Sequence, residues 1–240
     1  MNARGVKNLI FCVMPTFGNV DNDIVLNLIM QAPPIYRNLG WYFPSNMSVA
    51  EARNTAVKLA IENGAEYVYF RDYDVITPLN ALGILLARDY PIVGGLYYSK
   101  EFPPCPLTLR DGRPVTDWKF GEAVKCDVIG MGATLIKTEL FEKMEPPWFA
   151  TIVEPEDEDK SFRFQCTEDA YFCLRLAREQ GIYPYIDTAV NCEHLDLNTR
   201  ARYFYDPVRG TGVMVSADST FAIEKIPGPY VCDLTKGVEE

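Results

Sequence analysis

The sequence lacks several features, and each absence excludes a class of protein. No apolar run reaches the roughly 18 residues needed to span a bilayer, and the N-terminus has neither the long apolar region nor the cleavage site of a secretory signal. Lys and Arg number 23 against 33 Asp and Glu, so the formal net charge is −10, which argues against nucleic acid as a partner. We therefore expect a cytoplasmic protein without a transmembrane segment.

Metal-binding cysteine pairs are also missing. The seven cysteines form no C-x-x-C pair, so a zinc site is not indicated. Reduced and mostly buried thiols are the expected state in a cytoplasmic protein. Histidine is scarcer still, because His194 is the only one in the chain.

What is present is an alternation of short apolar runs with segments of helical spacing. This β-α-β-α order predicts an α/β fold with a mostly parallel sheet flanked by helices. Ser48 and Glu51 form a capping box at the start of a helix over 49–63. The predicted strands are 8–14, 39–43, 65–71, 91–98 and 182–190, with two more within 124–137. The other predicted helices are 23–31, one capped by Thr77, a short one that starts at Thr138, and 167–180.

The remaining stretches are read as connections. Residues 98–117 are rich in proline and turn formers and predict a long surface loop, and the acidic stretch 154–159 predicts an exposed, mobile loop. The acidic stretch and residues 162–166 together resemble a mobile flap that ends at the predicted helix 167–180. The chain divides into a main domain, 1–200, and a C-terminal tail, 201–240, that we expect to pack on or over the functional face.

Two aspartates carry the strongest functional signal. Asp72 and Asp74 follow directly on the apolar strand that ends at Arg71, and α/β sheets bind ligands at the carboxyl ends of their strands. Two close carboxylates repel each other unless a cation lies near them. The pair therefore indicates either a divalent metal site that receives a phosphate-bearing ligand or a strand that ends in a solvated turn.

A second acidic pair and the single histidine are further candidates. Glu168 and Asp169 follow Thr167 at a predicted helix start, where acids also stabilise the helix dipole. A carboxylate held there could accept a proton from a substrate hydroxyl. His194 follows the last predicted strand, and imidazole with carboxylates suits manganese and similar ions.

Weaker candidates come from the strand and helix ends of the first half. Arg53 lies in the capped helix and could face phosphates or solvent. Pro15 and Thr16 follow the first strand and could contact a nucleoside or form a simple turn. Gly95 would let the backbone approach a ligand, or mark a bulge.

Taken in order, these motifs resemble the GT-A fold glycosyltransferases, in particular the family 2-like group. The resemblance implies a single domain with a smaller antiparallel portion beside the mostly parallel sheet. The matching motifs are Pro15-Thr16, the Arg-Asn-x-Ala helix segment from Arg53, Asp72-Tyr73-Asp74, the glycine strand at Gly95, the strand 132–136, Thr167-Glu168-Asp169 and His194. The resemblance covers roughly residues 8 to 195. The sequence differs from the family in two places. The first strand is not followed by Tyr-Asn. No Gln-x-x-Arg-Trp motif follows later in the chain, so a processive polysaccharide synthase is not indicated.

The resemblance implies a metal-dependent hexosyltransferase that moves a sugar from a nucleotide diphosphate sugar to an acceptor hydroxyl on a glycan, lipid or small molecule. It implies that Asp74 and His194, with Asp72 nearby, bind Mn²⁺ or Mg²⁺, and that Pro15, Thr16, Arg53, Asp72 and Gly95 contact the donor. Asp169 would be the catalytic base of an inverting reaction, and Glu168 would orient the acceptor or the flap.

Three alternatives remain at this point. A retaining enzyme of the same fold would use Asp169 to position substrates. A sugar-phosphate nucleotidyltransferase would need a basic, glycine-rich loop after the first strand, whereas 14–19 contains one glycine and no Lys or Arg. A nucleotide-sugar-binding protein without turnover is the third.

Overall fold

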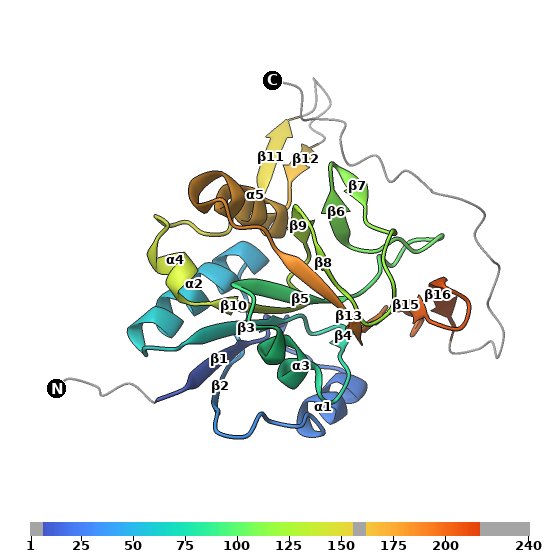
Figure 1. The fold of residues 1–240 in the computed structure, drawn as a ribbon, viewed down its shortest axis with the longest axis horizontal. Coiled ribbons are helices and arrows are strands. Elements are labelled where there is room, and N and C mark those ends of the chain that lie inside the picture. The colour runs from blue at the N-terminus through green and yellow to red at the C-terminus, as the bar shows by residue number, and fades with distance from the viewer. Residues whose placement is uncertain (1–6, 156–161, 217–240) are drawn as a thin grey trace.

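A seven-stranded sheet forms the centre of the molecule (Figure 1). The structure is a computed structural model that describes residues 7–155 and 162–216. In spatial order the strands are β2 (Asn38–Tyr42), β1 (Leu9–Val13), β3 (Tyr67–Arg71), β10 (Ala133–Lys137), β5 (Ile92–Leu96), β13 (Tyr185–Asn191) and β8 (Ala123–Lys125). Five strands run in one direction, and only β10 and β8 oppose them. The predicted mostly parallel sheet is confirmed.

Helices cover both faces of this sheet (Figure 1). They are α1 (Asn22–Ile29), α2 (Val49–Glu62), α3 (Ala81–Arg88), α4 (Glu139–Glu142) and α5 (Glu168–Gln180). Buried side chains of α2, α4 and α5 share one core cluster with β3 and β10, whereas those of α3 share the second cluster on the other face. The architecture is therefore a single α/β domain, and none of its described helices is long and apolar enough to cross a membrane.

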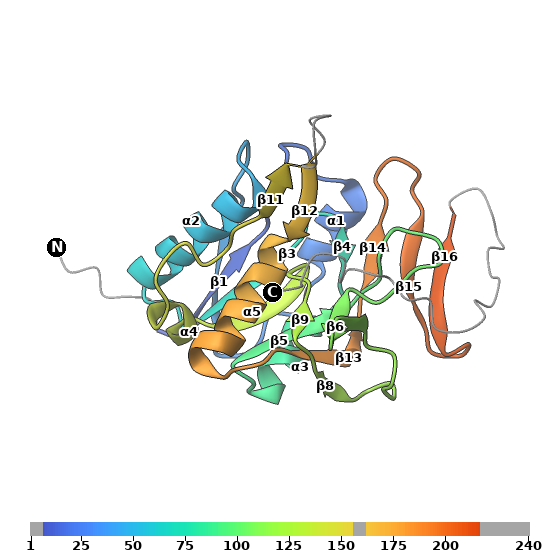
Figure 2. The same ribbon diagram turned by 90° about the horizontal axis from the view of Figure 1, so that it is seen from above.

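Three small antiparallel sheets flank the core, and Figure 2 shows one of them standing at the side of the domain. That sheet consists of β4 (Val75–Ile76), β14 (Glu193–Leu195), β15 (Arg202–Asp206) and β16 (Thr211–Val215). The second contains β6 (Thr108–Arg110), β7 (Arg113–Pro114) and β9 (Val128–Ile129), and the third is the hairpin of β11 (Ile152–Pro155) and β12 (Phe162–Cys166). The smaller antiparallel portion is thus confirmed.

Several predicted boundaries are confirmed and others are wrong. The capping box is present, since the Ser48 side chain accepts from the Glu51 N–H and the Glu51 carboxylate accepts from the Ser48 N–H. Thr77 does not cap a helix. Its N–H donates to Asn27 Oδ1 at 3.0 Å, and α3 begins only at Ala81. A buried tertiary partner therefore outweighs the local capping preference of threonine.

The predicted loop over 98–117 is also wrong in part. It contains β6 and β7, and Thr108 and Val115 are buried. Short strands rich in turn residues give no clear period in sequence. Of the predicted acidic loop, residues 156–159 lie outside the described residues, as do 217–240 of the predicted tail. Cys12, Cys126 and Cys192 are free and buried, and burial raises the pKa of each thiol to about 12.

Candidate functional site

The turn between β3 and β4 holds both predicted aspartates. β3 is buried along its whole length and carries the chain out of the core, where Asp72 N–H donates to the Gly132 carbonyl at 3.0 Å. The Val75 N–H then donates to the Asp72 carbonyl at 3.3 Å, which closes a tight turn. Asp72 and Asp74 are therefore fixed at the carboxyl end of the central sheet, where α/β proteins bind ligands.

Strand pairing brings His194 to the same place. β14 pairs antiparallel with β4 so that His194 lies opposite Val75, and the Leu195 N–H donates to the Asp74 carbonyl at 2.8 Å. As a result, His194 Nε2 lies 3.5 Å from Asp74 Oδ2. The two residues are 120 positions apart in sequence, and this short sheet brings them together.

The histidine ring is held in a defined tautomer. Its Nδ1 lies 2.7 Å from the Tyr98 carbonyl oxygen, which can only accept, so Nδ1 carries a proton. In the neutral ring Nε2 then presents a lone pair toward the Asp74 carboxylate. Two acceptors at this separation repel each other unless a cation or a further proton lies between them. A backbone carbonyl at the far nitrogen is also the usual support of a metal-binding histidine.

These residues fit a divalent cation as a two-ligand protein site. Among the described residues, no group of three or more His, Cys, Asp or Glu side chains could hold a metal ion. Mg²⁺ and similar ions are commonly bound by one or two protein ligands plus waters and substrate phosphates. Asp74 and His194 would then hold the ion only weakly in the absence of a phosphate-bearing ligand.

Lys100, which the sequence reading missed, also contacts Asp74. Its ammonium group donates to Oδ2 of the carboxylate, from the segment that follows β5. Burial acts to raise the pKa of Asp74, but the hydrogen bonds and charges of His194, when its ring is protonated, and of Lys100 outweigh it and lower this pKa. Asp74 is therefore an anion in a cationic environment. A lysine in a proline-rich stretch gave no signal in the sequence, because only the fold brings it to Asp74.

Arg53 connects the two acidic motifs. Its side chain is 3% exposed and donates to Asp72 Oδ1 at 2.9 Å and to the Glu168 carboxylate. The guanidinium lies 5.8 Å from the Phe70 ring centroid and 5.9 Å from that of Phe149. Burial raises the pKa of Asp72 even though the charge of Arg53 acts to lower it. The geometry makes Arg53 a buried bridge between the carboxylates, and its contact with phosphates stays a prediction.

We expect Arg53→Leu to destabilise the fold strongly. It would leave Asp72 and Glu168 without their shared cation, and breaking such a buried pair costs about 3–5 kcal/mol, less where the partners reach solvent. Urea unfolding of both proteins measures the difference in free energy of unfolding.

Arg37→Leu is the matched control for Arg53→Leu. Arg37 also pairs with a glutamate, Glu66, and lies 5.4 Å from the Tyr67 ring centroid, but at the surface. Exposed pairs contribute about 0–1 kcal/mol. Equal losses for the two variants would contradict the bridging role of Arg53.

A pocket joins most of the predicted residues. It is lined by Pro15, Thr16, Phe17, Met47, Val49, Arg53, Asp72, Tyr73, Asp74 and Glu168. Thr16 is set in place by a bridge to Ser45, and the rings of Phe17 and Tyr73 meet edge to face at 5.6 Å. The apolar residues Phe17, Met47 and Val49 were missed because single apolar side chains outside a periodic segment carry no functional signal.

Asp169 and Gly95 lie apart from this lining. Asp169 is half-buried in the first turn of α5, and its Oδ1 accepts from the Thr167 hydroxyl and from the Ala170 N–H at 2.8 Å. Gly95 is buried within β5, where an added Cβ would lie 2.7 Å from Val190 Cγ1 and 2.9 Å from Cys192 Sγ. Close packing, rather than access for a ligand, accounts for glycine at this position.

Comparison with known proteins gives a likeness in fold. No protein-family model matches the chain, and no curated protein matches it. The crystal structure of A197 from STIV superposes with a TM-score of 0.58 at 20% identity, over 91% of this chain and 99% of that chain. The two therefore share a fold over nearly their whole lengths.

Two structures of S. aureus TarS 1–349 are more distant. The complex with UDP-GlcNAc matches with a TM-score of 0.41 at 15% identity, over 74% of this chain and 57% of that chain. A second structure of TarS 1–349 gives 0.42 at 16% identity, over 75% and 60%. Scores at this level carry no conclusion about activity, which must come from the site itself.

Proposed function

We propose that this protein is a metal-dependent glycosyltransferase that transfers a sugar from a nucleotide diphosphate sugar to an acceptor hydroxyl. The observation that carries the proposal is the meeting of Asp74 and His194 at 3.5 Å, with Nδ1 of the ring held by a carbonyl. This juxtaposition suits a cation beside the pocket that Thr16, Asp72 and Asp74 line. The finer relation to the family 2-like group is part of the proposal and is supported by the sequence motifs.

Each residue of the site has a role in this proposal. Asp74 and His194 hold Mn²⁺ or Mg²⁺, which when bound supplies a Lewis acid for the charge that grows on the leaving diphosphate. Asp72, held by Arg53, faces the ribose or a metal-bound water. Pro15 and Thr16 border the nucleoside.

The second acidic pair acts on the acceptor. In the proposed inverting reaction Asp169 accepts the proton of the attacking hydroxyl. Glu168 lines the pocket and is anchored by Arg53, so it fixes the start of α5 relative to the β3–β4 turn. Because Arg53 touches both acidic motifs, it keeps the donor side and the acceptor side in a fixed relation.

The experiment that tests the proposal measures donor breakdown. The full chain is incubated with a panel of nucleotide diphosphate sugars and Mn²⁺, and release of the free nucleoside diphosphate is followed with and without acceptor sugars. Release that depends on added metal supports an enzyme. Donor binding by calorimetry without any release across the panel would instead support a binding protein.

Lys100→Met is expected to raise the affinity for Mn²⁺ measured without nucleotide. The Lys100 ammonium occupies the Asp74 carboxylate, so a metal ion must displace it. A charged hydrogen bond contributes about 1.5–3 kcal/mol, so removal of this competitor corresponds to a gain in affinity of about tenfold or more. Calorimetric titration of the free protein with MnCl₂ measures it.

Lys137→Met is the matched control for Lys100→Met, since Lys137 pairs with Asp89 at the surface at 2.8 Å. It removes the same charge from the protein and should leave Mn²⁺ affinity unchanged. Weaker Mn²⁺ binding by Lys100→Met would mean that the lysine supports the cation site rather than competing for it.

A further inference from the structure

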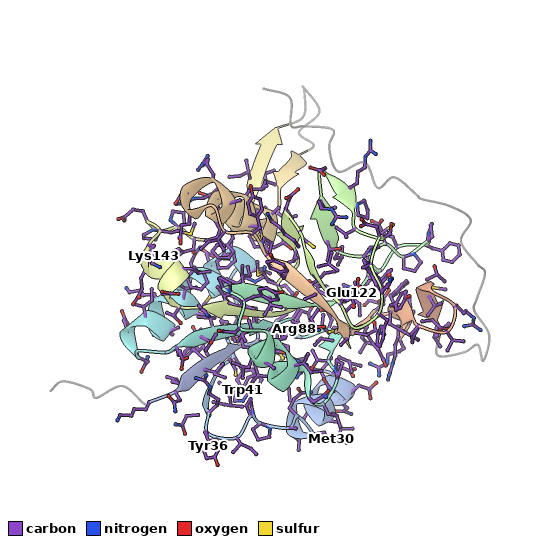
Figure 3. The ribbon with its side chains drawn as sticks, in the orientation of Figure 1. Met30, Tyr36, Trp41, Arg88, Glu122 and Lys143 are labelled. Carbon is purple, nitrogen blue, oxygen red and sulfur yellow. The ribbon has the colours of Figure 1, made fainter. Side chains whose placement is uncertain are left out.

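An exposed apolar strip runs along one edge of the domain. It consists of Val25, Leu26, Ile29, Met30, Ile35 and Tyr36, all exposed. Figure 3 shows Met30 and Tyr36 on the lower edge of the molecule. Leu79, also exposed, adjoins the strip because its carbonyl accepts from the Ala32 N–H at 2.8 Å. Contiguous exposed apolar residues of this kind mark interaction surfaces.

The opposite side of α1 already provides the contacts that hold the helix. Ile24 and Asn27 are buried, and the Asn27 side chain donates to the Thr77 carbonyl at 2.9 Å while accepting from the Thr77 N–H. The strip is therefore not needed to fix α1 on the domain. Ile29 is 75% exposed at the end of the helix.

The turn after α1 holds two large side chains in solvent. Ile35 is 79% and Tyr36 is 90% exposed, and Tyr36 has a φ of 68°. The turn is closed by the Arg37 N–H, which donates to the Pro34 carbonyl at 3.3 Å, and by Asn8 Nδ2, which donates to the Tyr36 carbonyl at 3.3 Å. A bulky residue at positive φ is strained, and such strain is typical of functional positions.

The charge around the strip differs from that of the rest of the chain. The chain carries 33 acids, yet residues 24–50 contain none, and Arg37 is their only charged residue. Arg37 is neutralised by Glu66. Lys7 is exposed and precedes Asn8, the residue that binds the turn. The surface at the turn is therefore neutral to positive on a protein of net charge −10.

We propose that the apolar strip inserts into the interface of a phospholipid bilayer. Ile29, Ile35 and Tyr36 would enter the boundary between headgroups and acyl chains, where tyrosine is enriched. The strip itself carries no carboxylate and the neighbouring Glu66 is paired with Arg37, so repulsion from lipid phosphates is small and Lys7 can approach them. A dimer formed through the strip is a poorer explanation. The strip follows an edge rather than a broad face, and both copies would carry a charge of −10.

The candidate pocket stays open in this arrangement. It lies after the carboxyl ends of β1 and β3, whereas the turn with Ile35 and Tyr36 precedes the amino end of the neighbouring parallel strand β2. Membrane attachment can therefore be tested without reference to the proposed function.

The test is flotation of the full chain with vesicles of phosphatidylcholine, alone and mixed with phosphatidylglycerol. We expect the native protein to float with vesicles and the variant Ile35→Asp/Tyr36→Asp to lose about tenfold or more in partition coefficient, since two large side chains no longer enter the apolar layer. Val208→Asp is the matched control, because Val208 is 93% exposed outside the strip. It should float like the native protein.

Three results would overturn the proposal. They are no flotation of the native protein with either vesicle, equal flotation of the double variant, and a native dimer in light scattering that Ile29→Asp converts to monomer. The last result would assign the strip to a second copy of the chain. Thermal unfolding of each variant verifies that the fold is kept, as expected for side chains in solvent.

Discussion

Asp74→Asn is expected to abolish metal-dependent donor binding. The variant keeps the shape of the side chain but removes the charge that faces His194 Nε2 at 3.5 Å. An amide is a much poorer ligand than a carboxylate for a hard divalent ion, and without the ion the donor diphosphate would meet the remaining carboxylates of the pocket. Calorimetric titration with nucleoside diphosphates in the presence of Mn²⁺ should show only the weak affinity that the native protein has without metal.

A double-mutant cycle with His194→Gln makes this prediction specific. If both side chains bind one ion, the double variant should lose little more affinity than either single variant, because the effects of residues acting on one ligand are not additive. Asp89→Asn is the control, since Asp89 is an exposed acid paired with Lys137. Unchanged donor affinity in Asp74→Asn, or additive losses in the cycle, would remove the shared cation from the proposal.

The sequence could predict the elements near Asp74, but not all of its partners. The capping box at Ser48 and the buried strand β3 are local patterns, and both are present in the structure. His194 could be listed as a candidate because it is the only histidine and follows a strand. Lys100 could not, because its contact with Asp74 depends on the path of an irregular segment between β5 and β6.

Tertiary contacts explain what the sequence could not show at three positions. Thr77 has the chemistry of a helix cap, yet its N–H is taken by Asn27, which lies 50 residues earlier. Arg53 looks like a solvated helix residue with a free charge, but the fold buries it between Asp72 and Glu168. Gly95 looks like a place for a ligand, but Val190 fills the space beside it. In each case a long-range partner decides the role.

Asp169→Asn is expected to leave donor binding intact and to lower transfer by about 10²–10⁴-fold. A positioned general base contributes about this factor. Asparagine retains an oxygen that can accept from the Ala170 N–H, as Asp169 Oδ1 does at 2.8 Å, so the start of α5 should keep its geometry. Transfer to an acceptor and donor affinity are measured on the same preparation.

Glu168→Gln separates catalysis from positioning. Glu168 is the neighbour that accepts from Arg53 and lines the pocket, so its change should weaken the bridge to Arg53 and lower the free energy of unfolding. Asp169→Asn should leave stability within about 1 kcal/mol, because no buried ion pair depends on it among the described residues. If Asp169→Asn turns over like the native protein, the proton of the acceptor hydroxyl goes elsewhere and the inverting mechanism loses its base. If both variants lose transfer only in proportion to lost stability, the acidic pair holds α5 in place and takes no part in the chemistry.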